Sequence, residues 1–257
     1  MRRAISASFG LYAVATLVFL YAPVLVMMAM SFNRSPLYEL PFEFDLRWFQ
    51  ALLHNSRLLR ATGNSILLAL ANTAVASLLG TLAALPLARY QFKGKTLLSG
   101  LLIPPIAIPW LILAIAMLLL FNFIGLARSL TSMFIGHVAV SLPYAIFVIL
   151  ARLSGTESTL EESAMSLGAG PWTTFFKITL PLMLPGVIAA ALFSFTVSFD
   201  NFVISYFLAP PGVSTLPVEI YSAIRKGFTP EINAIATITL AVSMILALFA
   251  VRMVREA

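Results

Sequence analysis

The residue that most needs a chemical explanation is Asp200, which lies inside a long apolar run. It is the one acidic residue that we place within such a run. A charge at the centre of a membrane helix costs about 2.5–3.5 kcal/mol on insertion scales, so such a side chain normally faces a polar interior. Asp200 is therefore a candidate counter-ion for a passing cationic group. The alternative is a structural role, with backbone or a residue of another subunit as its partner.

Three further residues join Asp200 in a candidate substrate path. Asn201 follows it directly, and Trp110 and Tyr206 carry aromatic rings that can present a face to a cation. Each ring also has a structural interpretation: Trp110 as an interfacial anchor or helix-packing residue, and Tyr206 as part of an outer aromatic belt. The sequence leaves both interpretations open.

The chain offers little for enzymatic chemistry. Its 257 residues include no cysteine, which excludes disulfides, thiol catalysis and cysteine-ligated metals. The two histidines, His54 and His137, make no metal-ligand spacing. Neither a His-Glu-x-x-His pair nor a Gly-x-Ser-x-Gly turn occurs, and Asp200 alone cannot form an aspartyl dyad. We expect no catalytic residue, no metal site and no cofactor in this chain.

Composition indicates a membrane protein. Hydrophobic residues make up 60% of the chain and charged residues only 10%, whereas about a quarter of the residues in a soluble domain are charged. A helix needs about 20 apolar residues to span the hydrocarbon core. Six runs are long enough, at about 9–32, 62–88, 97–121, 131–152, 182–207 and 232–254. We therefore predict an all-α membrane protein with about six transmembrane helices, as a single transmembrane domain over 1–257.

The basic residues set the expected orientation. Nine of the 16 lysines and arginines fall on the side that holds both termini, which favours the cytoplasm for that side. The net charge of +6 comes from residues scattered at the ends of apolar runs, so we expect no nucleic-acid partner. The run from Phe9 to Met30 is too long for a secretory signal core and is interpreted as an uncleaved first helix.

The longest cytoplasmic connection, residues 153–181, has the pattern of two short helices joined at a bend. Thr159 and Glu162 fit a capping box, so the first helix should begin near Thr159. Gly168 permits the backbone that ends a helix, and Pro171 suits the first turn of the next. The second helix would carry three apolar side chains on a cytosolic surface: Phe175, Phe176 and Ile178. This elbow favours a docked partner; the alternative is a loop folded back against its own helices.

The elbow also carries a family signature. The stretch Glu162-Ser163-Ala164, followed by Gly168 and by Ile178-Thr179-Leu180-Pro181, resembles the EAA signature of permeases in the ATP-binding-cassette importer superfamily. Ser163 stands where that signature usually has alanine, a small-for-small change. The resemblance implies a type I importer permease (MetI-like) fold, in which the elbow inserts into a groove of an ATPase and transmits its closure. The residues that it places at this ATPase-coupling contact are Glu162, Ala164, Gly168, Ala169 and Gly170.

Nearly the whole chain is similar to the second permease of spermidine/putrescine importers. The matching stretches are Phe19-Leu-Tyr-Ala-Pro23, Ser31-Phe-Asn33, Ser198-Phe-Asp-Asn201, Leu216-Pro217 and Pro230-Glu-Ile-Asn-Ala234. This resemblance implies a polyamine as the solute. Asn201 and Trp110 stand where those permeases commonly have acidic residues, which reduces the expected attraction for several ammonium groups. An opine or another amino-acid derivative is therefore an alternative solute.

The resemblance also implies a set of partners. The chain would form half of a translocation path in a bacterial inner membrane, in contact with lipid and with both termini cytoplasmic. It would pair with a second homologous permease, two copies of an ATP-binding subunit that hold ATP and Mg, and an external solute-binding protein. The main alternative from another class is a secondary transporter coupled to an ion through Asp200, which would not require the elbow.

Overall fold

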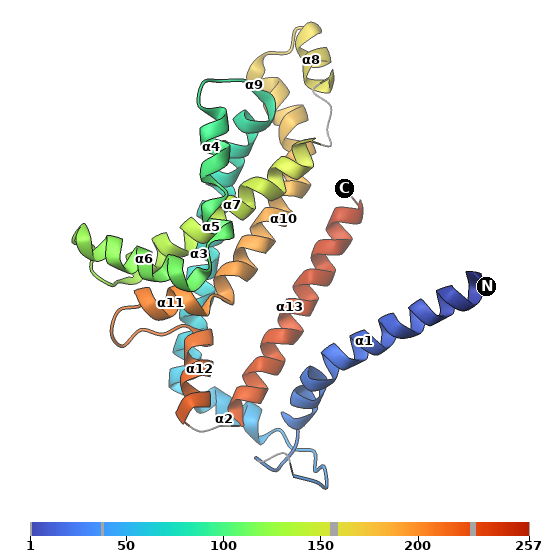
Figure 1. Ribbon diagram of the computed structural model, residues 1–257, viewed down its shortest axis with the longest axis vertical. Helices are drawn as coiled ribbons and strands as arrows, with labels where there is room; N and C mark the ends of the chain where they lie inside the picture. The colour runs from blue at the N-terminus through green and yellow to red at the C-terminus, as the bar shows by residue number, and fades with distance from the viewer. Residues whose placement is uncertain (1, 37–38, 155–158, 227–229, 257) are drawn as a thin grey trace. The chain divides into compact units, whose positions relative to one another are not determined.

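The computed structural model describes residues 2–36, 39–154, 159–226 and 230–256. In these residues the chain is helical apart from turns, loops and one isolated β-bridge between Asn33 and Phe44. The elements, labelled in Figure 1, are α1 (Arg2–Met30), α2 (Arg47–His54), α3 (Ser56–Arg89), α4 (Lys95–Leu101), α5 (Pro104–Ala107), α6 (Trp110–Phe123), α7 (Leu130–Ser154), α8 (Thr159–Ser166), α9 (Pro171–Thr174), the π-helix η1 (Phe175–Thr179), α10 (Leu180–Phe199), α11 (Phe202–Leu208), α12 (Leu216–Lys226) and α13 (Glu231–Glu256).

Most of the expected spans are present. Among the described residues, four helical segments are long and apolar enough to cross a membrane: Gly10–Met30, Ser56–Arg89, Leu130–Ser154 and Pro171–Phe199. A bent helix pair adds a fifth segment. The sixth expected span, 232–254, coincides with α13, whose apolar part is described only as far as Ile245, so part of that prediction lies outside the described side chains.

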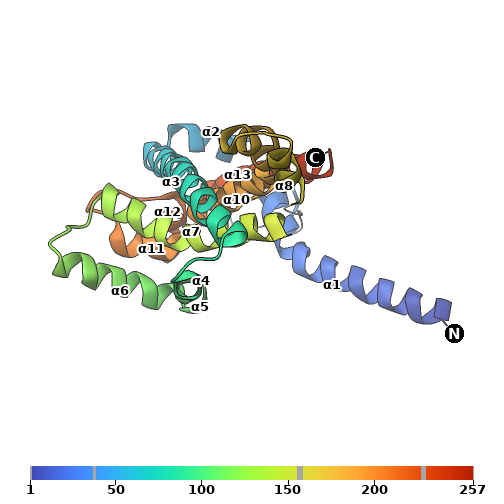
Figure 2. The same cartoon turned by 90° about the horizontal axis from the view of Figure 1, so that it is seen from above.

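The third span is broken, whereas the sequence predicted one continuous helix over 97–121. Lys95–Ala107 and Trp110–Phe123 meet at an angle of 110°. Figure 2 shows α4 and α5 together, with α6 running away from them. Pro109 is the physical reason, because a proline disfavours helical backbone at the preceding residue. Ile108 is accordingly extended, with φ −76° and ψ 131°.

The fifth span also differs from the expected 182–207. It starts earlier, at Pro171, and α10 ends at Phe199. Asn201 adopts extended backbone, and its Oδ1 accepts a 2.9 Å hydrogen bond from the Ile204 backbone N–H. An asparagine of this kind caps the start of a helix. It therefore begins α11 as a separate element, and Asp200 lies at the break instead of inside a helix.

The chain divides into two compact units, residues 1–59 with 220–246 and residues 60–219 with 247–257. In the second unit, α7 lies at the centre and packs along α10. One buried cluster joins α3, α6, α7 and α11, and another joins α3, α7 and α10. Gly136 lets α7 approach α11, since a Cβ there would lie 2.6 Å from Leu208 Cδ1. Small residues commonly allow such close packing of membrane helices.

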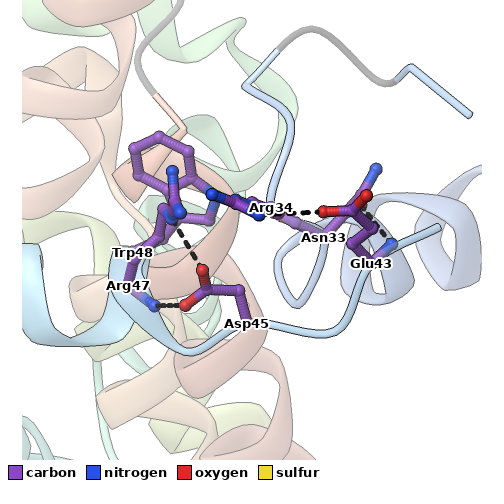
Figure 3. A network of polar contacts seen from close by, with 6 residues as sticks. All are labelled: Asn33, Arg34, Glu43, Asp45, Arg47 and Trp48. Carbon is purple, nitrogen blue, oxygen red and sulfur yellow. Dashed lines mark hydrogen bonds and ion pairs between the residues drawn. The ribbon is translucent and has the colours of Figure 1, made fainter. Parts of the chain in front are cut away.

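In the first unit, the loop after α1 is ordered around Asn33 (Figure 3). The Trp48 indole N–H donates to the Asn33 carbonyl at 2.8 Å. The Asn33 side chain accepts from the Glu43 backbone N–H at 3.0 Å and donates to the Glu39 carbonyl at 2.9 Å. These contacts satisfy both ends of a fully buried amide, which fixes the path of the loop.

Two ion pairs flank this network (Figure 3). Arg34 lies 3.3 Å from Glu43, and Arg47 lies 2.8 Å from Asp45. Hydrogen bonds from the backbone N–H and then the guanidinium of Arg47 lower the pKa of Asp45 below its usual range. Both pairs are exposed enough for solvent to screen them, so they contribute little to stability.

Candidate functional site

The elbow has the predicted form of a short helix followed by a glycine turn. Helix α8 begins at Thr159. After it, Gly168 has a φ of +90°, in the left-handed region that glycine adopts without a steric penalty. The Gly168 N–H donates to the Met165 carbonyl at 2.9 Å, and the Ala169 N–H donates to the Ala164 carbonyl at 3.0 Å. These bonds satisfy carbonyls at the helix end and fix the bend.

The second predicted helix starts at Pro171, as expected, but it is not a separate short helix, because α9, η1 and α10 continue as one helical segment to Phe199. Gly170 before it is extended, with φ −71° and ψ 160°. Of the predicted coupling residues, Glu162, Gly168 and Gly170 are exposed, and Ala164 and Ala169 are half-buried. The structure therefore places all five along one short protruding stretch.

The apolar surface of the elbow differs in part from the predicted patch. Phe176 is exposed, but Phe175 and Ile178 are half-buried. The sequence interpretation missed Leu167 and Trp172, which are 90% and 74% exposed. Trp172 stacks on Phe176 with ring centroids 6.2 Å apart. An aromatic surface of this kind on a protruding segment suits a protein partner.

An ion pair attaches the elbow to α3. Glu161 in the first turn of α8 and Arg89 at the end of α3 lie 3.1 Å apart, and their side chains are only 13% and 14% exposed. Neither residue was among the predicted coupling residues. Glu161 stands beside Glu162 in the sequence, but nothing in the local pattern indicates a partner 72 residues away.

The predicted substrate-path residues divide into two exposed and two packed side chains. Asp200 is exposed at the end of α10, and Tyr206 is 46% exposed on α11, where its ring lies 5.3 Å from that of Phe202. Asn201 is buried and caps α11. Trp110 is half-buried and packs against the buried cluster that includes α11 residues, which supports its helix-packing interpretation.

A buried histidine that the sequence interpretation left unassigned links the elements around the break. His137 on α7 contacts the Ser198 hydroxyl of α10 through Nδ1 at 2.8 Å and the Ser205 hydroxyl of α11 through Nε2 at 3.0 Å. Farther along, Asn72 of α3 donates to the Ser141 hydroxyl at 3.0 Å. The spacing of four between His137 and Ser141 could have revealed this inward-facing polar stripe.

Helix α10 connects the two candidate regions. Its 20 residues correspond to about 30 Å of helix, close to the thickness of the hydrocarbon core. The elbow precedes its first residue and Asp200 follows its last (Figure 1). A segment suited to a partner therefore lies at one end of a span, and an exposed carboxylate lies at the other.

Comparison with known proteins defines the family. The model for binding-protein-dependent transport system inner membrane components matches residues 76–256. The spermidine/putrescine transport system permease protein PotC of Escherichia coli is 35% identical over 237 residues, covering 92% of this chain and 90% of the relative. PotC of Haemophilus influenzae is 37% identical over 229 residues, covering 89% of each chain. The putrescine permease PotI of Escherichia coli is 37% identical over 229 residues, covering 86% of this chain and 82% of the relative.

Solved structures agree on the fold. One is a bacterial alginate ABC transporter in complex with a periplasmic protein that holds an alginate pentasaccharide. A chain of that transporter matches with a TM-score of 0.74 at 21% identity, and the match covers 100% of this chain and 97% of the transporter chain. A chain of the MetNI methionine ABC transporter matches with a TM-score of 0.61 at 18% identity. The match covers 79% of this chain and 98% of the MetNI chain. At these identities the likeness establishes the fold alone.

The chain belongs to the family of binding-protein-dependent transport system inner membrane components. It is a multi-pass permease of a bacterial ABC importer, which works with a binding protein and with a separate ATPase that hydrolyses ATP. The predicted family, type I importer permease fold and importer function are thus confirmed. The ion-coupled secondary carrier is not supported.

Proposed function

We propose that this permease carries a small amine-bearing solute, such as a polyamine, past Asp200. The observation that supports this proposal is the identity of its relatives, which are named as spermidine/putrescine and putrescine permeases at 35% and 37% identity. Asp200 supplies an exposed carboxylate beside a helix break, and Tyr206 supplies an exposed ring on the next helix. A carboxylate and an aromatic face are both groups that attract an ammonium ion.

The number of ammonium groups is limited by the other two residues of the candidate path. The Asn201 side chain is engaged in capping α11, and Trp110 packs against apolar neighbours. Neither carries a negative charge, so Asp200 is the one carboxylate of the four. This favours a solute with few positive charges, such as the diamine putrescine. An opine or another amino-acid derivative stays the alternative solute.

The same proposal assigns the elbow to the ATPase. Glu162, Ala164 and the Gly168–Gly170 turn would contact the ATPase, with Leu167 and Trp172 supplying apolar surface. The support is the exposure of Glu162, Leu167 and Trp172 on a bend that the Gly168 backbone holds in one shape. Closure of the ATPases would then push on α8 and move the helices attached to it. No group of the elbow needs to react, because its role is mechanical.

The assembly that follows has two permeases and two ATPases. This chain would pair with a second homologous permease to enclose the path, and each permease would bind one of two ATPase copies. An external binding protein would deliver the solute. We place both termini in the cytoplasm, on the same side as the elbow, because six spans and the flanking basic residues favour that orientation.

Uptake by the host cell tests the solute class. The chain is deleted from its host and restored on a plasmid, and uptake of radiolabelled putrescine, spermidine and an opine is compared. We expect deletion to abolish saturable uptake of putrescine or spermidine and the plasmid to restore it. Unchanged polyamine uptake together with loss of opine uptake would overturn the polyamine proposal in favour of the alternative.

A further inference from the structure

We propose that the ion pair between Arg89 and Glu161 transmits movement of the elbow to α3. The two charged groups lie 3.1 Å apart and are mostly buried, at 14% and 13% side-chain exposure. They join the last residue of α3 to the first turn of α8. This inference rests on the proposed docking of the elbow to the ATPase, and it adds a second route by which that docking reaches the membrane helices.

Each charge is placed where its own helix favours it. The C-terminal end of a helix carries partial negative charge and the N-terminal end partial positive charge. Arg89 lies in the last turn of α3, and Glu161 lies in the first turn of α8. Both helix dipoles therefore stabilise the charges that form the pair between the two helix ends.

Burial distinguishes this pair from an ordinary surface contact. Arg34 and Glu43 form a pair at 3.3 Å, but their side chains are 62% and 57% exposed and solvent screens them. The Arg89–Glu161 pair is shielded, and separating it would leave two poorly hydrated charges without each other. A displacement of α8 is therefore followed by α3 more readily than it breaks the pair.

The elbow thus has two connections to the membrane helices. Helix α8 packs against α9 and η1, and η1 continues into α10 without a break in the helix. The covalent connection moves α10, whereas the ion pair moves α3. Loss of the pair should therefore uncouple α3 while α10 still responds, which a merely stabilising contact would not do.

A cysteine-free chain makes this difference measurable. Single cysteines are placed at Gly63, near the far end of α3, and at Thr196, near the far end of α10; both sites are exposed, and a Cβ at Gly63 meets no atom within 4 Å. The assembled complex is treated with a maleimide with and without Mg-ATP and vanadate. We expect nucleotide to change the labelling rate at both sites in the otherwise unaltered chain.

Neutral variants then break the pair. Arg89→Gln or Glu161→Gln should reduce the nucleotide-dependent change at Gly63→Cys by about fivefold or more, the scale of an ordinary allosteric coupling. The change at Thr196→Cys should persist, and the ATPase should still co-purify. The charge swap Arg89→Glu with Glu161→Arg should recover part of the effect, because it restores the pair but opposes both helix dipoles.

Lys93→Gln is the matched control, since Lys93 is an exposed cation four residues beyond Arg89, and it should leave both reporters unchanged. A full response at Gly63→Cys in the single variants, or no nucleotide response there in the unaltered chain, would overturn the inference. Loss of the ATPase in the single variants would also overturn it, because the pair would then serve docking. Docking itself is tested separately by Gly168→Val: retained ATPase in that variant would contradict the proposed docking, on which this inference rests, whereas the Gly63→Cys reporter tests the ion pair.

Discussion

Asp200 and His137 show what one residue can and cannot reveal in a membrane sequence. The unusual charge of Asp200 was visible in the sequence, but the helix break beside it was not predicted, although Asn201, which caps α11, is a residue type that often starts a helix. His137 drew no assignment because its two partners, Ser198 and Ser205, lie 61 and 68 residues away. The three side chains come together only when α7, α10 and α11 pack.

Replacement of Asp200 tests the proposed counter-ion. Asp200→Asn keeps the shape of the side chain and removes its charge, so the KM for putrescine uptake should rise about fivefold, as expected for a partly solvated pair worth about 1 kcal/mol. Complex assembly should stay unchanged. Asp45→Asn, at a half-buried carboxylate of the first unit that pairs with Arg47, is the control. Identical kinetics for Asp200→Asn and the unaltered chain would assign Asp200 a structural role.

Replacement of His137 tests the buried link around the break. His137→Ala removes two interhelical hydrogen bonds and leaves a cavity, so the purified protein should lose about 1–3 kcal/mol of stability. A lower midpoint of thermal unfolding measures this loss. His54→Ala, at the other histidine, which is exposed, should leave the midpoint unchanged. If His137→Ala unfolded at the same midpoint as the unaltered protein, the buried link would contribute nothing to stability.

At the level of elements, the sequence predicted where most helices lie, but it predicted only some of the breaks between them. Proline and glycine marked the start and end of the elbow helices, because their backbone preferences act locally. The 110° bend at Pro109 was not expected, since prolines in membrane helices often produce only a kink. The apolar surface of the elbow was misjudged at Phe175 and Ile178, which are half-buried, because the contacts that η1 makes with α8, α9 and α10 are not visible in the local pattern.

Two glycines of the elbow allow the effect of backbone conformation to be distinguished from the effect of a side chain that clashes with the ATPase. Gly168 has left-handed backbone and Gly170 does not, yet a Cβ at either site would meet no atom within 4 Å in this chain. Gly168→Val should cost about 1–2 kcal/mol of local strain and lower the recovery of ATPase with the purified permease. Gly170→Val suits its extended backbone and should keep that recovery. Equal loss in both variants would mean that valine clashes with the ATPase directly, against the role given to the bend.

For the whole molecule, the sequence predicted the class of protein better than its substrate. Long apolar runs and the EAA-like stretch suffice for an importer permease, because both are local patterns. The solute depends on which few side chains meet across the assembled path, and the same fold occurs in transporters of alginate and of methionine. The single domain over 1–257 and the coupling-loop boundaries at 153–181 stay predictions.

The most direct test of the account is transport by the purified complex in vesicles. The complex is reconstituted with ATP inside or outside, the binding protein is added to the opposite side, and radiolabelled putrescine is supplied with that protein. We predict accumulation that requires ATP on the elbow side, ceases in Gly168→Val, and continues when ion gradients are collapsed. Uptake by this chain without the ATPase, abolished by collapse of an ion gradient, would contradict the account.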